Sequence, residues 1–261
     1  MLLTSVIIVL REVLEASLII GVLLALSNRL QSGRHWPKWS IGIGLVGAAV
    51  YAASTATVSD WLDGVGQEVI NAFMQIMIFC CLALITLIFS KSDKQSLANS
   101  RLIVVLMIVS VSLSIIREGS EILIYLSSFI SDRDMLQSIL LGGLVGAGIG
   151  TSVGALIYYI LLNINRTWLP YASISVVILI GAGMAGQASL LLIQADWLPS
   201  QAPLWDSSGL IAEDSIIGQL LYALIGYEAT PTPIQATAYF GGLLLPLALI
   251  LITRQATSTD A

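Results

Sequence analysis

Residues 102–130 read LIVVLMIVSVSLSIIREGSEILIYLSSFI, an apolar stretch with a charged motif, Arg-Glu-Gly-Ser-Glu, at 117–121. A helix of about 20 residues crosses the hydrocarbon core of a bilayer, so this stretch is long enough to span it. A charge at the centre of such a helix costs at least about 2.5–3.5 kcal/mol and usually marks a functional site. The stretch therefore predicts a transmembrane helix that carries functional ionisable groups.

The charged motif occurs a second time, as Arg-Glu-Val-Leu-Glu at 11–15 within the apolar stretch 4–27. Residues three and four apart are neighbours on a helix, so each motif gathers its arginine and its two glutamates on one side. Four carboxylates against two guanidinium groups leave an excess of negative charge, which favours a multivalent cation. Oxygen ligands without histidine or thiolate indicate a hard ion. The candidate metal ligands are Glu12, Glu15, Glu118 and Glu121, with Arg11 and Arg117 as their partners.

The composition of the whole chain indicates a membrane protein. Of its 261 residues 57% are hydrophobic and only 10% are charged, with a mean hydropathy of +0.92. A soluble domain would carry about 25% charged residues. The net charge of −5 argues against a nucleic-acid partner, which would call for a basic surface. Lipid is therefore the expected surrounding.

Seven apolar stretches are long enough to span the membrane. Backbone groups must be paired within lipid, and these stretches are too long for barrel strands, so we expect an all-α membrane protein formed by residues 1–261 as a single domain. The expected spans are 4–27, 40–58, 68–89, 102–130, 137–162, 171–193 and 235–253.

The basic residues predict the orientation. Eight of them fall in connections on one side, and by the positive-inside rule that side is the cytoplasm. They are Arg29, Arg34, Lys38, Lys91, Lys94, Arg101, Arg166 and Arg254, and Arg133 falls on the other side. The N-terminus is then outside and the C-terminus inside. The outer connections are acidic, which would concentrate cations there.

The two motifs also predict an internal repeat. In this topology the first and fourth spans run in opposite directions, and the second and fifth spans both carry small residues at every fourth position. Such stripes allow close helix packing, and inverted repeats are common in transporters with a midplane site. We expect repeats at about 1–90 and 100–193, followed by an outer loop and a seventh helix at about 194–253.

Three other features remain open at this point. Asn71, Gln75 and Gln187 either line a pathway or form interhelical hydrogen bonds. Residues 214–226 predict a short helix capped by Asp214, either on the outer surface or re-entrant. The charged motifs have rival explanations: a lock of buried ion pairs, a proton relay, or a metal-dependent membrane redox subunit. The last would usually need histidine or cofactor ligands, so an enzyme is not expected.

The paired motifs, with the tail residues Leu204-Trp205-Asp206, Glu213-Asp214-Ser215 and Gly226-Tyr227, resemble the oxidase-dependent iron permease family, which includes bacterial EfeU-type transporters. The resemblance implies high-affinity iron uptake at the inner membrane, with iron as cargo, no cofactor, and an iron-oxidising or iron-delivering partner outside. It also implies roles for the four motif glutamates and for Glu68. A proton-coupled carrier of another divalent cation, such as lead or manganese, is the alternative.

One position departs from that family's pattern. The residue after the first Arg-Glu pair is usually glycine there, and this chain has Val13. The bulkier side chain is expected to narrow that half of the site, which bears on the choice of metal rather than on transport itself.

Overall fold

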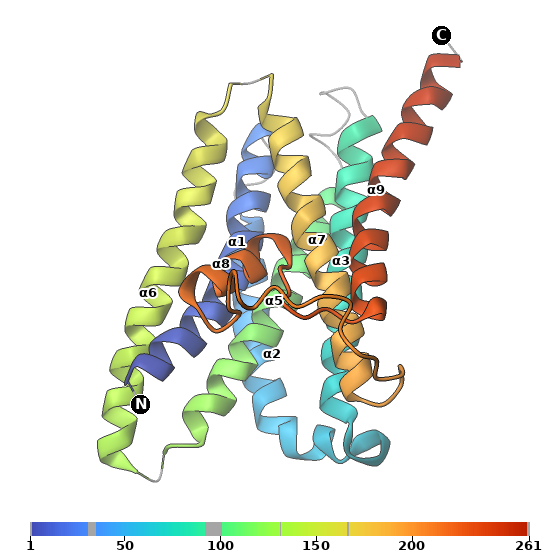
Figure 1. Cartoon of the computed structure of the whole chain (residues 1–261). Helices are drawn as coiled ribbons and strands as arrows, with labels where there is room; N and C mark the ends of the chain where they lie inside the picture. The colour runs from blue at the N-terminus through green and yellow to red at the C-terminus, as the bar shows by residue number, and fades with distance from the viewer. Residues whose placement is uncertain (1, 31–34, 92–100, 131, 166, 260–261) are drawn as a thin grey trace.

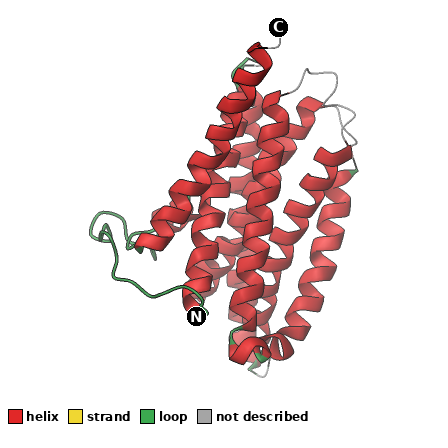
Figure 2. Ribbon diagram, turned by 90° about the vertical axis from the view of Figure 1, so that its right-hand side faces the viewer, coloured by secondary structure: helices red, strands yellow, loops and turns green. Residues whose placement is uncertain are grey.

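The fold is a bundle of long helices (Figures 1 and 2), described by a computed structural model over residues 2–30, 35–91, 101–130, 132–165 and 167–259. No strand occurs in these ranges, so the expected all-helical class is confirmed there. The helices are α1 (Leu2–Leu30), α2 (Trp36–Ser59), the 3-10 helix η1 (Trp61–Gly64), α3 (Gly66–Lys91), α5 (Arg101–Ser127), α6 (Arg133–Asn163), α7 (Leu169–Gln194), α8 (Ile216–Ile225) and α9 (Pro233–Thr259).

Six of these helices are long and apolar enough to cross a membrane, counted over the described ranges: α2, α3, α5, α6, α7 and α9. The helix α1 has 29 residues, which is also sufficient length, but it carries the charged group Arg11, Glu12 and Glu15. Many of its apolar side chains are deeply buried, and Leu18, Val22 and Leu23 have no exposed surface. The charges of α1 therefore belong to a helix that is enclosed by other helices.

The two ends of the chain lie at opposite ends of the bundle (Figure 1). Of the basic residues that predict the orientation, Lys38 and Arg101 are exposed at the starts of α2 and α5. Arg34, Lys94 and Arg166 lie outside the described residues, as do the side chains of Arg29, Lys91, Arg133 and Arg254.

The long helices pair across the chain rather than with their sequence neighbours. The helix α1 packs mainly on α6, α5 packs mainly on α2, and α3 packs on α7, which also contacts α9. The small residues of α6 make the first pairing possible. A Cβ atom at Gly146 would lie 2.4 Å from the backbone oxygen of Val6, and one at Gly154 would lie 2.7 Å from the backbone oxygen of Ser17. The predicted small-residue stripe is therefore a helix-packing surface.

We expect Gly146→Ala to destabilise the protein, because its methyl group would meet the backbone of α1 and not a flexible side chain. Overpacking of this kind typically costs about 1–3 kcal/mol. Gly148→Ala is the matched control on the same helix, since a Cβ atom there has no neighbour within 4 Å. The measurement is thermal unfolding of the detergent-purified variants. Equal melting temperatures for the two variants would contradict the close packing of α1 and α6.

The segment between α7 and α9 folds back against the bundle and contains α8 (Figure 1). The predicted cap Asp214 is wrong by one residue: the side chain of Ser215 accepts the hydrogen bond from Gly218 N, at 3.0 Å, and α8 starts at Ile216. The helix ends as predicted at Gly226, in the left-handed conformation with φ 67°. A Cβ atom at Gly226 would lie 2.5 Å from Gly183 Cα, so this glycine lets α8 end directly on α7.

Candidate metal centre

The two charged motifs meet where α1 contacts α5, as the repeat predicts. One carboxylate oxygen from each of Glu12, Glu118 and Glu121 lies within 4.8 Å of the other two. Oxygens that bind one metal ion at about 2.2 Å are at most about 4.4 Å apart. A shift of a few tenths of an ångström would therefore bring all three onto one ion.

Because these carboxylates are buried, holding them close together without a cation costs free energy. Glu12 and Glu118 are 5% and 2% exposed, and each has one buried oxygen, Oε2, without a hydrogen-bond partner. Like charges this close repel strongly in a low-dielectric interior, and a proton or a metal ion between them relieves the repulsion. We call Glu12, Glu118 and Glu121 the carboxylate triad. The triad has the oxygen donors and the uncompensated negative charge of a site for a hard cation.

Arg117 joins the two motifs. Its guanidinium is buried and pairs with Glu118 of its own helix, with Glu15 of α1 at 3.4 Å, and with Glu121 at 3.6 Å. Because it spans both helices, Arg117 fixes the position of one motif relative to the other and offsets part of their negative charge.

Arg11 occupies a different environment although its motif has the same spacing. Its side chain is 40% exposed, and Nε lies 3.6 Å from Glu15 Oε1 and 3.9 Å from Glu12 Oε1. Its guanidinium carbon lies 4.7 Å from the ring centre of Tyr222 in α8, a cation–π contact. Nothing in the sequence pattern pointed to Tyr222, because the contact depends on how the loop folds back.

Glu15 is not among the three glutamates whose oxygens lie within 4.8 Å of one another, and its partners are positive and neutral donors. It pairs with Arg11 and Arg117, and its Oε2 accepts a hydrogen bond from Gln187 Nε2 at 3.5 Å. Gln75 Nε2 in turn donates to Gln187 Oε1, joining α3 to α7. Gln75 and Gln187 are therefore interhelical hydrogen-bonding residues, and Gln187 also reaches the charged centre.

The remaining predicted positions lie around this centre. Glu68 is in the first turn of α3 and is not part of the triad. Asn71 accepts a hydrogen bond from Tyr51 at 3.0 Å. Val13 packs toward Gly150 of α6, where its Cγ1 atom lies 3.1 Å from the place of a Cβ atom. Gly150 of α6 thus makes room for the valine side chain, and the expected effect of Val13 on the choice of metal stays a prediction.

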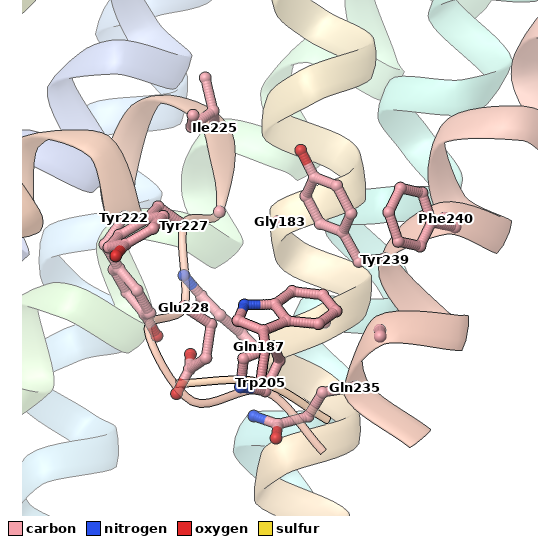
Figure 3. Close-up of a pocket in the computed structure, with 14 residues that line it drawn as sticks. Gly183, Gln187, Trp205, Tyr222, Ile225, Tyr227, Glu228, Gln235, Tyr239 and Phe240 are labelled. Carbon is pink, nitrogen blue, oxygen red and sulfur yellow. The ribbon is translucent and has the colours of Figure 1, made fainter. Parts of the chain in front are cut away.

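A cavity of about 200 Å³ lies beside this centre, between α7, α9 and the segment that contains α8 (Figure 3). Aromatic side chains form much of its wall, and Glu228 contributes a carboxylate. Partial burial, and next the negative charge of Glu213, raise the pKa of Glu228 to about 7, whereas the positive charge of Arg11 opposes that rise.

The long apolar helices and the buried, carboxylate-rich centre define a multi-pass membrane protein with a candidate cation site. Comparison with known sequences identifies the family: residues 2–257 match the iron permease FTR1 family, and the chain belongs to it. The resemblance seen in the sequence is thereby confirmed.

Similar curated proteins are named as ferrous iron permeases. The chain is 23% identical over 269 residues to ferrous iron permease EfeU of Yersinia pestis, covering 96% of this chain and 94% of the relative. It is 24% identical over 270 residues to ferrous iron permease EfeU of Escherichia coli O6:H1 (strain CFT073), covering 97% and 96%. No solved structure matches the chain.

Proposed function

We propose that this protein is a high-affinity permease that moves iron ions across the inner (plasma) membrane through the centre formed by its two charged motifs. The observation that carries the proposal is the carboxylate triad, which gathers buried acidic oxygens from two helices with too little positive charge to balance them. Membership of an iron permease family makes iron the expected cargo. The ion is a substrate that passes through, and the chemistry required of the protein is coordination rather than catalysis.

In this proposal α1 is the seventh membrane-crossing helix, with the N-terminus outside and the C-terminus inside. The opposite positions of the chain ends support an odd number of crossings. The helix pairing supports an inverted repeat of 1–90 and 100–193. A two-fold axis that exchanges α1 with α5, α2 with α6 and α3 with α7 converts the α1–α6 pair into the α5–α2 pair and maps α3–α7 onto itself.

The transport cycle then follows from the charges. Outer acidic groups collect the ion, the triad replaces its water ligands, and Arg117 with Glu15 holds the two motifs in register. A rocking motion of one repeat against the other would change which side of the membrane reaches the centre. An iron-oxidising or iron-delivering protein outside the membrane would supply the ion.

Radioiron uptake into proteoliposomes that contain only this protein tests the proposal. We expect saturable uptake by the wild type, and uptake near that of empty liposomes when Glu12, Glu118 and Glu121 are all replaced by glutamine. Lead and manganese serve as competitors, and an internal pH dye reports coupled protons. Wild-type liposomes that take up iron no faster than empty ones, or that transport lead or manganese while excluding iron, would contradict the proposed function.

A further inference from the structure

We propose that the cavity between α7, α9 and the segment 205–231 is a second cation site, which captures a hydrated divalent cation through Glu228 before the ion reaches the carboxylate triad. The inference rests on the proposed function for the direction of movement, but binding at the cavity is a separate property. In the proposed topology this segment connects two spans on the outer side, where the ion arrives.

The size of the cavity fits an ion that still carries its first water shell. The cavity volume of about 200 Å³ is many times the volume of about 10–15 Å³ that one water needs on the same measure, so an ion can enter with its water ligands. A small divalent ion keeps an octahedral shell of this kind and releases it reluctantly. The triad, by contrast, offers three carboxylate oxygens close to coordination spacing, which suits an ion that has lost water.

The lining of the cavity favours a cation. Glu228 supplies a carboxylate, and Gln187 supplies an amide. Trp205, Tyr222 and Tyr227 surround that end of the cavity (Figure 3). Aromatic faces attract positive charge, and the rings reduce the contact of the partly buried carboxylate with bulk water. Among the residues that form the wall, Glu228 is the charged one.

Two residues of the wall connect the cavity to the charged centre. Gln187 lines the cavity and is 7% exposed, and its Nε2 donates to Glu15. Tyr222 lines it as well and lies under the guanidinium of Arg11. Gln187 and Tyr222 therefore link the cavity to Glu15 and Arg11 of the first charged motif, which places the proposed capture site beside the charged centre.

The close contact of Gly226 with Gly183 positions this wall. Since neither residue has a side chain, the end of α8 rests on α7 and places Tyr227 and Glu228, the next two residues, at the cavity. The contact between the two glycines thus fixes the position of the segment against the bundle, whereas a loosely attached surface loop would have no fixed position.

The first test is Mn²⁺ binding to purified protein in detergent, measured by electron paramagnetic resonance, in a Glu118→Gln/Glu121→Gln background that disables the triad. We expect one bound Mn²⁺ to remain in this background. Adding Glu228→Gln is expected to weaken its binding at least tenfold, and Glu228→Asp to weaken it less. Asp214→Asn is the matched control, an exposed acid of the same segment that does not line the cavity, and it should leave binding unchanged.

The second test is iron uptake by otherwise wild-type protein in proteoliposomes. Glu228→Gln should raise the half-saturating iron concentration about tenfold and leave the maximal rate within twofold, because capture is weakened while the triad is intact. Unchanged Mn²⁺ binding together with unchanged half-saturation would overturn the second site and leave the permease function standing. Glu228-dependent Mn²⁺ binding by a protein that takes up no iron would support the site and overturn the permease function.

Discussion

Replacing Glu118 by glutamine is expected to reduce iron uptake at least about 100-fold. Loss of groups that merely orient metal ligands already costs about 10–100-fold in metal affinity, and Glu118 is proposed as a direct ligand. Its carboxylate is 2% exposed, has one oxygen without a hydrogen-bond partner, and lies within 4.8 Å of the other two members of the triad. Glutamine preserves the shape of the side chain and removes the charge.

The measurement is radioiron uptake per inserted molecule in proteoliposomes. Lys38→Gln is the control, because Lys38 is an exposed charge at the start of α2, away from the triad and on the inner side in the proposed topology, and it should retain uptake within about twofold of the wild type, as expected for a screened surface charge. Full uptake by correctly folded Glu118→Gln protein would exclude Glu118 as a ligand.

Replacing Arg117 by glutamine is expected to destabilise the protein by about 3–5 kcal/mol, the typical cost of leaving buried charges without their partner. The arginine side chain is 5% exposed and pairs with three glutamates on two helices, so three carboxylates lose their counter-ion at once. Thermal unfolding and the yield of monodisperse protein measure the effect.

Arg11→Gln is the matched comparison, since Arg11 has the same place in the other motif but a half-exposed side chain and longer contacts. Solvent-accessible pairs contribute about 0–1 kcal/mol, so a much smaller loss is expected. The double variant Arg117→Gln/Glu118→Gln should recover part of the lost stability, because it removes one uncompensated charge. Equal losses for the two arginine variants would show that Arg117 is not the main link between the motifs.

Much of the architecture could be predicted from local sequence. Each expected span became a helix whose ends differ from the prediction by a few residues, because uninterrupted apolar stretches in lipid have few alternatives to helix. The gathering of Glu12, Glu118 and Glu121 followed from the repeated motif and from the cost of isolated charges in a membrane.

The differences between the two motifs could not be predicted, because they arise from tertiary contacts. Arg11 and Arg117 have identical spacing to their glutamates, yet α8 covers one of them while the other is enclosed between α1 and α5. Glu15 accepts a hydrogen bond from Gln187, which is 172 residues away in sequence, and also pairs with both arginines. Asp and Ser are both favoured at the N-cap, so sequence preferences alone could not show that Ser215, and not Asp214, caps α8.

The pairing of α1 with α6 has a consequence for how the protein is made. The ribosome releases α1 long before α6, so a helix with three charges inside its apolar stretch must enter the membrane before the glycine surface that receives it has been synthesised. Likewise α2 is synthesised before α5, the helix on which it mainly packs. Neither repeat contains its own packing partner, and a fragment that ends after α3 would expose both contact surfaces to lipid or to quality-control proteases. Co-expressed halves, in contrast, should assemble, since the contacts that hold α1 and α2 are supplied by the second half.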